Sequence, residues 1–408
     1  MRYKQLLFNL ILLLTAIILF FVIGEIFFRI FRGAPNPLEN TVQRKRQFLF
    51  EPNKPIHGVS TVKGEYDYTA RINNYGYRGA DFLLPKPEDV LRIFAIGDSF
   101  AFGVGAKDDE TIPALLENYL RSKSVKTEVV NAGVGHASPV KEYFNLKNIF
   151  LKHGPDMAVL FFDLTDLWDD WHSERMAIKD KGGEIVGFNS AFINGKRSWW
   201  RTFVNHSAFC KYINDKIVRS FRKIQSIGLR EYVDAIRTGK KVKALIANSQ
   251  MNLPEDKYLE YDGVLMMRGR EKKDLIDKQF LRTAGYILKI KRLLNDNNIP
   301  FVLVMYPHGI YVDGNQWKDG RLSWGFKAGK TYTDYYAFEL MEKFAKENGI
   351  AFVNTLPYFL ENKKEGEIYY FDYDGHMTPS GYKMVSDSVI EDRVFKGVIK
   401  KFMPYLDL

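Results

Sequence analysis

Short apolar runs alternate with longer amphipathic segments over most of the chain after residue 90. Runs rich in Val, Ile, Leu and Phe occur at Leu91–Ile96, Thr127–Val130, Met157–Phe162, Phe301–Met305 and Ala351–Asn354. Near-continuous apolar strands of this kind are typical of a parallel sheet that is covered on both faces. The pattern therefore predicts an α/β protein with five parallel strands.

Amphipathic segments with helical spacing separate the predicted strands. Helices are expected near 112–122, 140–153, 273–294 and 334–348, and a last helix follows Pro379. We therefore predict one doubly wound domain over residues 87–408, with its chemistry at the carboxyl ends of the strands. The alternation is interrupted between about 171 and 272, which we assign to a large insertion.

The N-terminal segment has a different character. From Gln5 to Gly24 no residue is charged, and about 20 apolar residues form roughly 30 Å of helix, enough to cross a bilayer core. Because Glu25 and two phenylalanines follow Gly24, an uncleaved transmembrane anchor in residues 1–30 is favoured over a cleaved signal peptide or a buried core helix. Prolines and glycines then indicate a stalk and lead-in over residues 31–86.

The topology of such an anchor places most of the chain on one side of the membrane. The tail before the apolar segment is very short, and a long domain translocates largely regardless of its charge. We expect a single-pass membrane protein whose catalytic domain lies on the outer side, periplasmic or extracellular.

Composition narrows the classes of partner. The chain has 408 residues, a formal net charge of +10 and one cysteine, Cys210, which excludes an intramolecular disulfide and a thiolate metal cage. The positive charge favours anionic surroundings, but no nucleic-acid recognition motif accompanies it, so we expect no nucleic-acid partner. The most basic stretch, 211–243, is interpreted as an ordinary amphipathic helix, with a membrane-surface helix as the alternative.

A serine and a histidine stand at two of the predicted strand ends. Gly97-Asp98-Ser99 follows the first strand, where the serine hydroxyl can project into the crevice and its N–H can face a developing oxyanion. Serine is a weak nucleophile unless a base removes its proton. His376, just before the last helix, is the candidate base, and Asp374 is suited to orient its ring.

These motifs resemble those of the SGNH (GDSL) hydrolase superfamily, in its membrane-anchored bacterial form. Gly97–Phe100 (GDSF) matches the first block of that family, Asn131–Gly135 (NAGVG) the second and Asp374–His376 (DGH) the last, while residues 74–79 resemble the lead-in of anchored members. The resemblance implies a three-layer α/β/α fold of the flavodoxin-like type. It also implies an ester hydrolase or acyltransferase with a Ser99–His376–Asp374 triad, no cofactor and no metal.

The resemblance also suggests an oxyanion hole, with two departures from the family. Its donors would be the N–H of Ser99, an N–H near Gly135 with His136 as the alternative position, and the hydroxyl of Thr165, which stands where the family has asparagine. Losing one such donor typically lowers the rate by about 10² to 10³. The two-residue spacing of Asp374 and His376 resembles that of alginate-type O-acetyltransferases and some esterases.

Two further groups of residues remain. An acidic cluster with a histidine spans 163–174, and we interpret it as a solvated loop rather than a metal site. Asp98 and His308 are candidate substrate-binding residues, and for His308 a structural role is the favoured alternative.

The predicted function is that of a membrane-anchored serine esterase or deacylase. It would act on an acylated glycan or lipid through an acyl-enzyme. One alternative is an O-acyltransferase that modifies a cell-surface polysaccharide. A second alternative, motivated by Thr165, is a catalytically weak glycan-binding protein.

Overall fold

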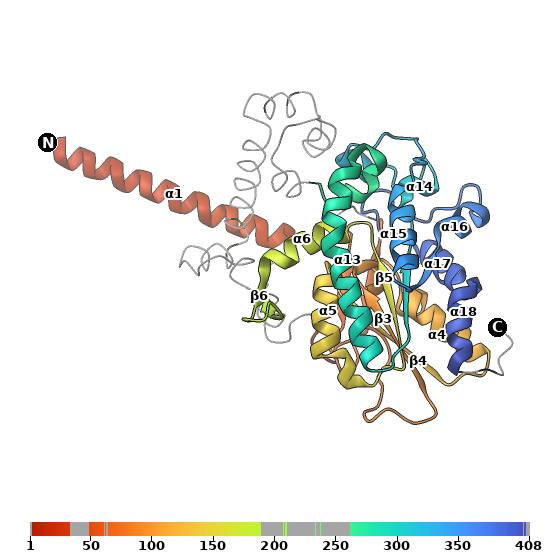
Figure 1. Cartoon of the computed structure of the whole chain (residues 1–408). Coiled ribbons are helices and arrows are strands. Elements are labelled where there is room, and N and C mark those ends of the chain that lie inside the picture. The colour runs from red at the N-terminus through yellow and green to blue at the C-terminus, as the bar shows by residue number, and fades with distance from the viewer. Residues whose placement is uncertain are drawn as a thin grey trace. The chain divides into compact units, whose positions relative to one another are not determined.

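The computed structural model describes residues 2–32, 49–188 except 61 and 63, and 262–402, together with single residues at 207, 209, 233, 237 and 404 (Figure 1). Contacts between residues divide the chain into two units. One unit comprises Met1–Gln47 and Asn189–Gly239, and the other comprises Phe48–Phe188 and Lys240–Leu408.

The first unit contains helix α1 (Arg2–Arg32). Within this unit the carboxylate of Glu25 accepts hydrogen bonds from the Ser207 hydroxyl, at 2.6 Å, and from the N–H of Phe209, at 3.1 Å. A search of the residues that the structure describes finds no helix that is both long and apolar enough to cross a membrane. The transmembrane anchor therefore stays a prediction, and the basic stretch 211–243 lies outside the described residues apart from 233 and 237.

The second unit is built on a five-stranded parallel sheet. Its strands are β3 (Leu91–Gly97), β4 (Thr127–Gly133), β5 (Met157–Phe162), β8 (Phe301–Met305) and β9 (Ala351–Asn354), in the order β4-β3-β5-β8-β9. All neighbouring pairs are parallel. The predicted α/β class and the five parallel strands are confirmed, and the strand order is that of a flavodoxin-like doubly wound sheet.

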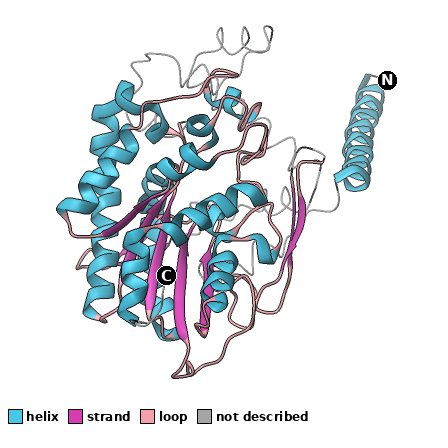
Figure 2. Cartoon of the chain, turned by 90° about the vertical axis from the view of Figure 1, so that its right-hand side faces the viewer, coloured by secondary structure: helices cyan, strands magenta, loops and turns pink. Residues whose placement is uncertain are grey.

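Helices lie on both sides of this sheet (Figure 2). Helices α5, α6 and α13 pack together, and α4 packs against α17. The longer helices are α4 (Ile112–Ser122), α5 (Pro139–Asn148), α6 (Asp166–Met176), α13 (Lys273–Asp296), α15 (Tyr336–Glu347), α17 (Pro379–Glu391) and α18 (Arg393–Phe402). The short helices are α3 (Ser99–Phe102), η1 (Asp108–Glu110), η2 (Phe150–His153), η3 (Leu265–Lys272), α14 (Gly309–Val312), η4 (Gly320–Trp324) and α16 (Leu356–Asn362).

Two antiparallel hairpins accompany the sheet. They are formed by β1 (Ile56–Val59) with β2 (Asp67–Ala70), and by β6 (Ala177–Lys179) with β7 (Ile185–Phe188). The first hairpin belongs to the lead-in that precedes the sheet. Further along this lead-in, Tyr77 and Phe82 are buried in the same core as the sheet.

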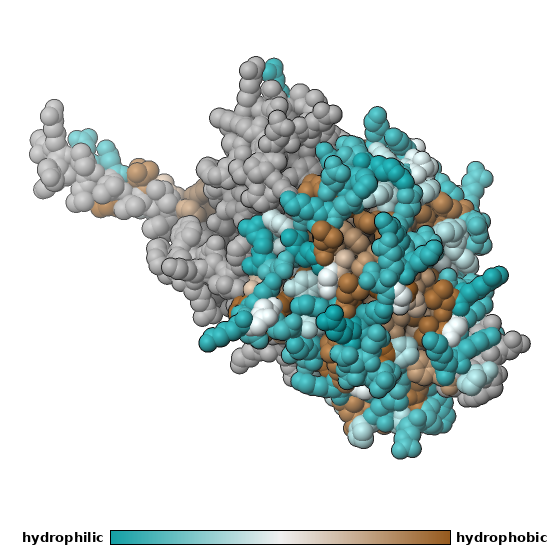
Figure 3. Space-filling model, in the orientation of Figure 1, coloured by the Kyte–Doolittle hydropathy of each residue, from teal (hydrophilic) through white to brown (hydrophobic). Residues whose placement is uncertain are grey.

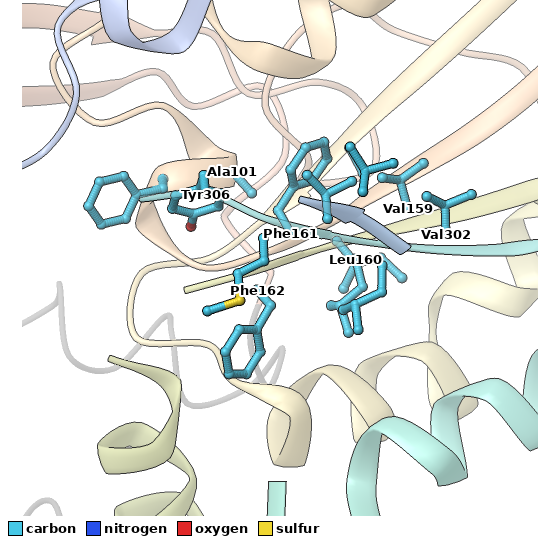
Figure 4. Close-up of a cluster of buried hydrophobic side chains, with 14 of the residues drawn as sticks. Ala101, Val159, Leu160, Phe161, Phe162, Val302 and Tyr306 are labelled. Atoms are coloured by element: carbon cyan, nitrogen blue, oxygen red, sulfur yellow. The ribbon is translucent and has the colours of Figure 1, made fainter. Parts of the chain in front are cut away.

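The core explains why the strands are apolar on both faces. Val159, Leu160, Phe161 and Phe162 of β5 and Val302 of β8 are fully buried (Figure 4). Each completely buried side chain of this size contributes roughly 1.5–3 kcal/mol relative to its exposed state. On the face that Figure 3 presents, hydrophilic side chains dominate the described surface, and apolar ones appear between them.

Candidate active site

Ser99 is presented by a tight turn at the carboxyl end of β3, an inner strand that lies between β4 and β5. The strand ends at Gly97 and α3 begins at Ser99, while the Asp98 side chain caps this helix by accepting a hydrogen bond from Phe100 N at 2.8 Å. A Cβ on Gly133, at the end of β4, would lie 2.2 Å from Phe102 N. The sequence therefore needs glycine at this strand end so that α3 can pack against it.

The histidine and aspartate predicted from the sequence lie next to this serine. The distance from His376 Nε2 to Ser99 Oγ is 2.8 Å, and His376 Nδ1 is hydrogen-bonded to Asp374 Oδ1. This arrangement assigns the proton of the imidazole to Nδ1, which leaves Nε2 free to accept the hydroxyl proton. The ring of Phe100 packs on the imidazole, with centroids 4.7 Å apart.

The carboxylate of Asp374 is kept ionised by its neighbours. Burial acts to raise the pKa of Asp374, but the hydrogen bonds and charge of His376, together with the hydrogen bond from Tyr66, outweigh burial and hold the pKa below its usual value. An ionised carboxylate at this position stabilises a positively charged imidazole.

A buried arginine that the sequence analysis did not single out holds the loop after Ser99. Arg78 donates hydrogen bonds to the carbonyls of Phe102, Gly103 and Ala106, at 2.9, 2.7 and 2.7 Å, and to Asp108 Oδ1 at 2.9 Å. These carbonyls have few partners because α3 is only one turn long. The signal was present, since Arg78 lies in the lead-in that carried part of the family resemblance.

Two backbone N–H groups are available for an oxyanion. Among the described residues, the N–H groups of Ser99 and Gly135 have no hydrogen-bond partner. Gly135 is exposed, and a Cβ on it would have no neighbour within 4 Å. His136, the alternative position, has a positive φ of 59° and lines the same cavity as Ser99.

The structure does not support Thr165 as the third oxyanion donor. Its hydroxyl donates to Asp163 Oδ2, and its N–H donates to the same oxygen at 3.0 Å. The physical reason is the carboxylate two residues earlier, which accepts both donors. Asp163 stands where the related motif has glycine, so the hydroxyl proton is directed away from Ser99.

His308 forms a second histidine–aspartate pair in the site. Its Nε2 lies 2.8 Å from Asp163 Oδ1, and both side chains are buried. Burial acts to raise the pKa of Asp163, but the charge and hydrogen bonds of His308 and Thr165 outweigh it and lower this pKa. His308 also lines the cavity, and its Nδ1 has no hydrogen-bond partner among the described residues.

A cavity of about 400 Å³ opens beside the serine, and most of its lining is apolar. Aromatic side chains form much of its wall, and two indole N–H groups in this wall, those of Trp168 and Trp317, are buried without a partner among the described residues. The lining residues are Asp98, Ser99, Phe100, His136, Thr165, Trp168, Asp169, Gly263, Val264, His308, Trp317, Trp324, Asp374, Gly375 and His376. A volume of this order suits a small ligand.

The interpretation of residues 163–174 as a solvated loop is wrong. Residues from Asp166 onward form α6, and Asp163, Asp166 and Asp170 are buried. Burial, reinforced by the charges of neighbouring carboxylates, raises the pKa of Asp98, Glu142 and Asp166 well above the usual range. The sequence pattern missed this helix because carboxylates interrupt the apolar residues of its buried face, where Leu167 and Trp171 stand among aspartates.

The described part of the chain contains no group of three or more His, Cys, Asp or Glu side chains that could hold a metal ion. The fold and the site together define an α/β protein with a hydrogen-bonded serine, histidine and aspartate at the carboxyl edge of its parallel sheet.

Comparisons with known proteins add the following. A scan of protein-family models and a search of curated proteins found no match. Among solved structures, the chain is similar to a lipolytic protein of the G-D-S-L family from Desulfitobacterium hafniense (14% identity, TM-score 0.30, 73% of this chain and 97% of that chain). It is also similar to the acetyl xylan esterase AlAXEase, at 14% identity and a TM-score of 0.33, over 73% of this chain and 98% of that chain. A third similar structure is a catalytic mutant of an acetylxylan esterase from Geobacillus stearothermophilus, at 12% identity and a TM-score of 0.34, over 73% of this chain and 92% of that chain.

These neighbours are ester hydrolases by their descriptions, at low identity. Their TM-scores are too low for the likeness to carry an argument about this chain.

Asp170 provides a test of the buried acidic cluster. It accepts hydrogen bonds from Val140 N of α5, at 2.9 Å, and from the Thr283 hydroxyl of α13, at 2.6 Å, and burial raises its pKa from 3.8 to about 6. Because the pKa of Asp170 is higher in the folded protein than in the unfolded chain, its contribution to stability is fully present below about pH 4. This contribution is lost as the pH rises through 6. Asp170→Asn does not titrate, so it should remove that pH dependence.

The measurement is the free energy of unfolding by urea at pH 4 and pH 6.5. Between pH 4 and pH 6.5 the free energy of unfolding of the wild type should fall by on the order of 2–3 kcal/mol more than that of Asp170→Asn. Asp296→Asn, an exposed aspartate at the end of α13, serves as the control and should follow the wild type. Parallel curves for wild type and Asp170→Asn would contradict the raised pKa.

Proposed function

We propose that this protein is a serine esterase or deacylase of the SGNH type. The observation that carries the proposal is the hydrogen-bonded series Ser99–His376–Asp374, which opens on a cavity beside the end of β3. A nucleophile, a base and an orienting carboxylate in this order are the arrangement that activates a serine hydroxyl.

The reaction proceeds in two halves. Ser99 Oγ attacks the ester carbonyl carbon while its proton passes to His376 Nε2, and Asp374 stabilises the imidazolium. The tetrahedral intermediate then breaks its bond to the alcohol oxygen, which takes the proton from His376 and leaves. Water repeats the sequence on the acyl-enzyme, and the products are the free acid and the restored serine.

The oxyanion is stabilised by backbone rather than side-chain donors in this proposal. The N–H groups of Ser99 and Gly135 are the donors, since the Thr165 hydroxyl is engaged by Asp163. Asp98 contributes by fixing the turn that aims Ser99 instead of contacting substrate. With two donors instead of three, we expect a slower enzyme than one that has an asparagine amide at this position.

An acylated glycan is the substrate class that the cavity suits best. Trp168 and Trp324 both lie beside Gly263, where a Cβ would be 3.6 Å from Trp168 and 3.2 Å from Trp324. Aromatic faces pack well against the apolar faces of sugar rings. An acylated lipid is the other substrate that the mostly apolar lining accommodates.

Ser99→Ala tests the proposed nucleophile. The wild type should be labelled by a fluorophosphonate probe and should hydrolyse p-nitrophenyl acetate, and both properties should vanish in the variant because the attacking oxygen is gone. Ser122→Ala, at an exposed serine of α4, is the control and should behave as the wild type. A folded wild type that resists labelling would overturn the esterase and favour the catalytically weak glycan-binding protein.

Transfer of the acyl group from Ser99 to a sugar hydroxyl is the second candidate function. The two-residue spacing of Asp374 and His376 and the tryptophan pair beside the serine favour it, because an acyl-enzyme that binds a sugar can deliver its acyl group to that sugar before water arrives. Incubation with an acyl donor and an acceptor oligosaccharide should then yield the acylated oligosaccharide, detected by mass spectrometry. Exclusive release of free acid at saturating acceptor would contradict transfer.

We also propose that residues 5–24 anchor the chain in a membrane with the catalytic unit outside, which rests on the uncharged apolar run of the sequence. The full-length protein should stay in the membrane fraction after an alkaline wash. Leu14→Arg places a charge near the middle of the run at a cost of about 2.5–3.5 kcal/mol and should release part of the protein. Recovery of the wild type in the soluble fraction would exclude the anchor.

A further inference from the structure

The tip of the β1–β2 hairpin is a closed turn with a fixed carboxylate. Ser60 N donates to the carbonyl of Tyr66 at 3.0 Å, which closes the turn. The Ser60 hydroxyl donates to Glu65 Oε2 at 2.6 Å, so one oxygen of Glu65 is held by the hairpin itself. The other oxygen is free to bind something outside the hairpin.

That second oxygen binds the loop that carries Asp374 and His376. Glu65 Oε1 accepts hydrogen bonds from Tyr373 N at 2.6 Å and from Asp374 N at 3.1 Å. The partners lie more than 300 residues apart in the sequence, as the 308-residue separation of Glu65 and Tyr373 illustrates. Hydrogen bonds between a carboxylate and backbone N–H groups are stronger than neutral ones, so this contact fixes the loop well.

The neighbouring tyrosine contacts the carboxylate of Asp374 directly. Tyr66 donates its hydroxyl proton to Asp374 Oδ2 at 3.1 Å, while His376 Nδ1 binds the other oxygen, Oδ1. Burial and the negative charge of Asp374 raise the pKa of Tyr66, so the phenol keeps its proton and remains a donor. Among the described residues, Tyr66 and His376 are the only side chains that hydrogen-bond to Asp374.

The ring of Tyr66 also connects the two loops of the site. It packs against Phe371, with centroids 5.0 Å apart. Phe371 in turn lies against Gly105 in the loop after α3, where a Cβ would be 2.4 Å from the Phe371 ring and 3.3 Å from Tyr66. The hairpin tip therefore contacts the segment after Ser99 as well as the segment that holds the base.

The opposite edge of the Asp374 loop is held by a different part of the chain. The carbonyl of Asp372 accepts hydrogen bonds from the N–H groups of Asp319 and Gly320, both at 2.9 Å. The indole of Trp317 lies under Gly375, where a Cβ would be 2.6 Å from its Nε1. This edge fixes the backbone of the loop but provides no donor to the Asp374 carboxylate.

From these contacts we infer that Glu65 and Tyr66 are positioning residues of the active site, and we call them the hairpin clamp. Glu65 fixes the backbone of the Asp374 loop. Tyr66 fixes the rotation of the Asp374 carboxylate and partly neutralises its negative charge through the hydrogen bond to Oδ2. The inference rests on the proposed function, because it assigns the clamp to the orientation of His376 toward Ser99.

The clamp has an electronic effect that distinguishes it from a purely structural contact. A donor on Oδ2 withdraws negative charge from the carboxylate, so Asp374 attracts the imidazolium of His376 less strongly. Without that donor, Asp374 should bind the protonated imidazole more strongly. Because acylation requires the neutral imidazole, the acidic limb of the pH profile of kcat/KM should then move to higher pH.

Tyr66→Phe tests this effect while keeping the ring. We expect kcat/KM for p-nitrophenyl acetate to fall about tenfold. This is the lower end of the effect expected from losing a hydrogen bond to a charged group, because water can partly replace the phenol. The acidic limb should move up by about half a pH unit. A loss of rate without any movement of the limb would reduce Tyr66 to a structural contact and overturn its assignment.

Glu65→Ala and Glu65→Gln test the backbone contact. Alanine leaves the N–H groups of Tyr373 and Asp374 without their acceptor, and kcat should fall at least tenfold with little change in KM. Glutamine retains an acceptor oxygen, so it should recover most of the rate. Asp67→Asn, an exposed position of the same hairpin, is the matched control and should leave activity unchanged.

The rate of fluorophosphonate labelling of Ser99 separates the clamp from the proposed function. A wild type that is labelled quickly, with Tyr66→Phe and Glu65→Ala labelled slowly at unchanged thermal stability, would support the clamp. Equal labelling rates and equal pH profiles in all three proteins would overturn the clamp and leave the esterase intact. A wild type that is not labelled would overturn the esterase and the clamp together.

Discussion

The hydrogen bond between His376 Nε2 and Ser99 Oγ joins two loops that are 277 residues apart in the chain. The two residues stand at opposite ends of the fold in sequence, because Ser99 follows β3, the first strand of the sheet, while His376 lies after its last strand, β9. Side-chain contacts alone cannot place two atoms within hydrogen-bond reach over such a separation. The apolar strands do most of this work, since the burial of β3, β5 and β8 along their whole length fixes the positions of their ends.

Charge is the second constraint on the site. Asp98, Asp163, Asp166 and Asp170 lie close together with almost no access to water. A buried carboxylate is stable only when donors surround it or when it holds a proton. The structure uses both solutions, because Asp163 is stabilised by His308 and Thr165 as an anion, while the pKa of Asp166 is raised by burial and by its acidic neighbours. Because Asp163 accepts both the hydroxyl and the N–H of Thr165, neither donor is left for an oxyanion at Ser99.

The sequence predicted the strands better than the polar interior. All five parallel strands were expected within about three residues of their observed bounds, because a strand buried on both faces is apolar at nearly every position. Helix α6 was missed because aspartates stand beside Leu167 and Trp171 on its buried face and obscure the periodicity of apolar residues that identifies a helix. Arg78 was missed for a related reason, because the pattern of apolar residues cannot predict that an arginine is buried among backbone carbonyls.

The site residues divide in a similar way. Ser99, His376 and Asp374 could be named from short motifs, because each motif places a reactive side chain directly after a strand or before a helix. Glu65 and Tyr66 could not be named, since nothing in the residues around a hairpin turn indicates which distant loop they will contact. Such contacts depend on the three-dimensional course of the lead-in.

The lead-in thus contributes to the site at two points. Arg78 holds the carbonyls of the loop after Ser99, and Tyr66 binds the carboxylate of Asp374 at the other end of the hydrogen-bonded series. A parallel sheet alone fixes where its strands end but leaves the loops beyond them with unpaired polar groups. In this protein a segment that precedes the sheet satisfies those groups in both loops, so the geometry between nucleophile and base depends on residues that belong to neither loop.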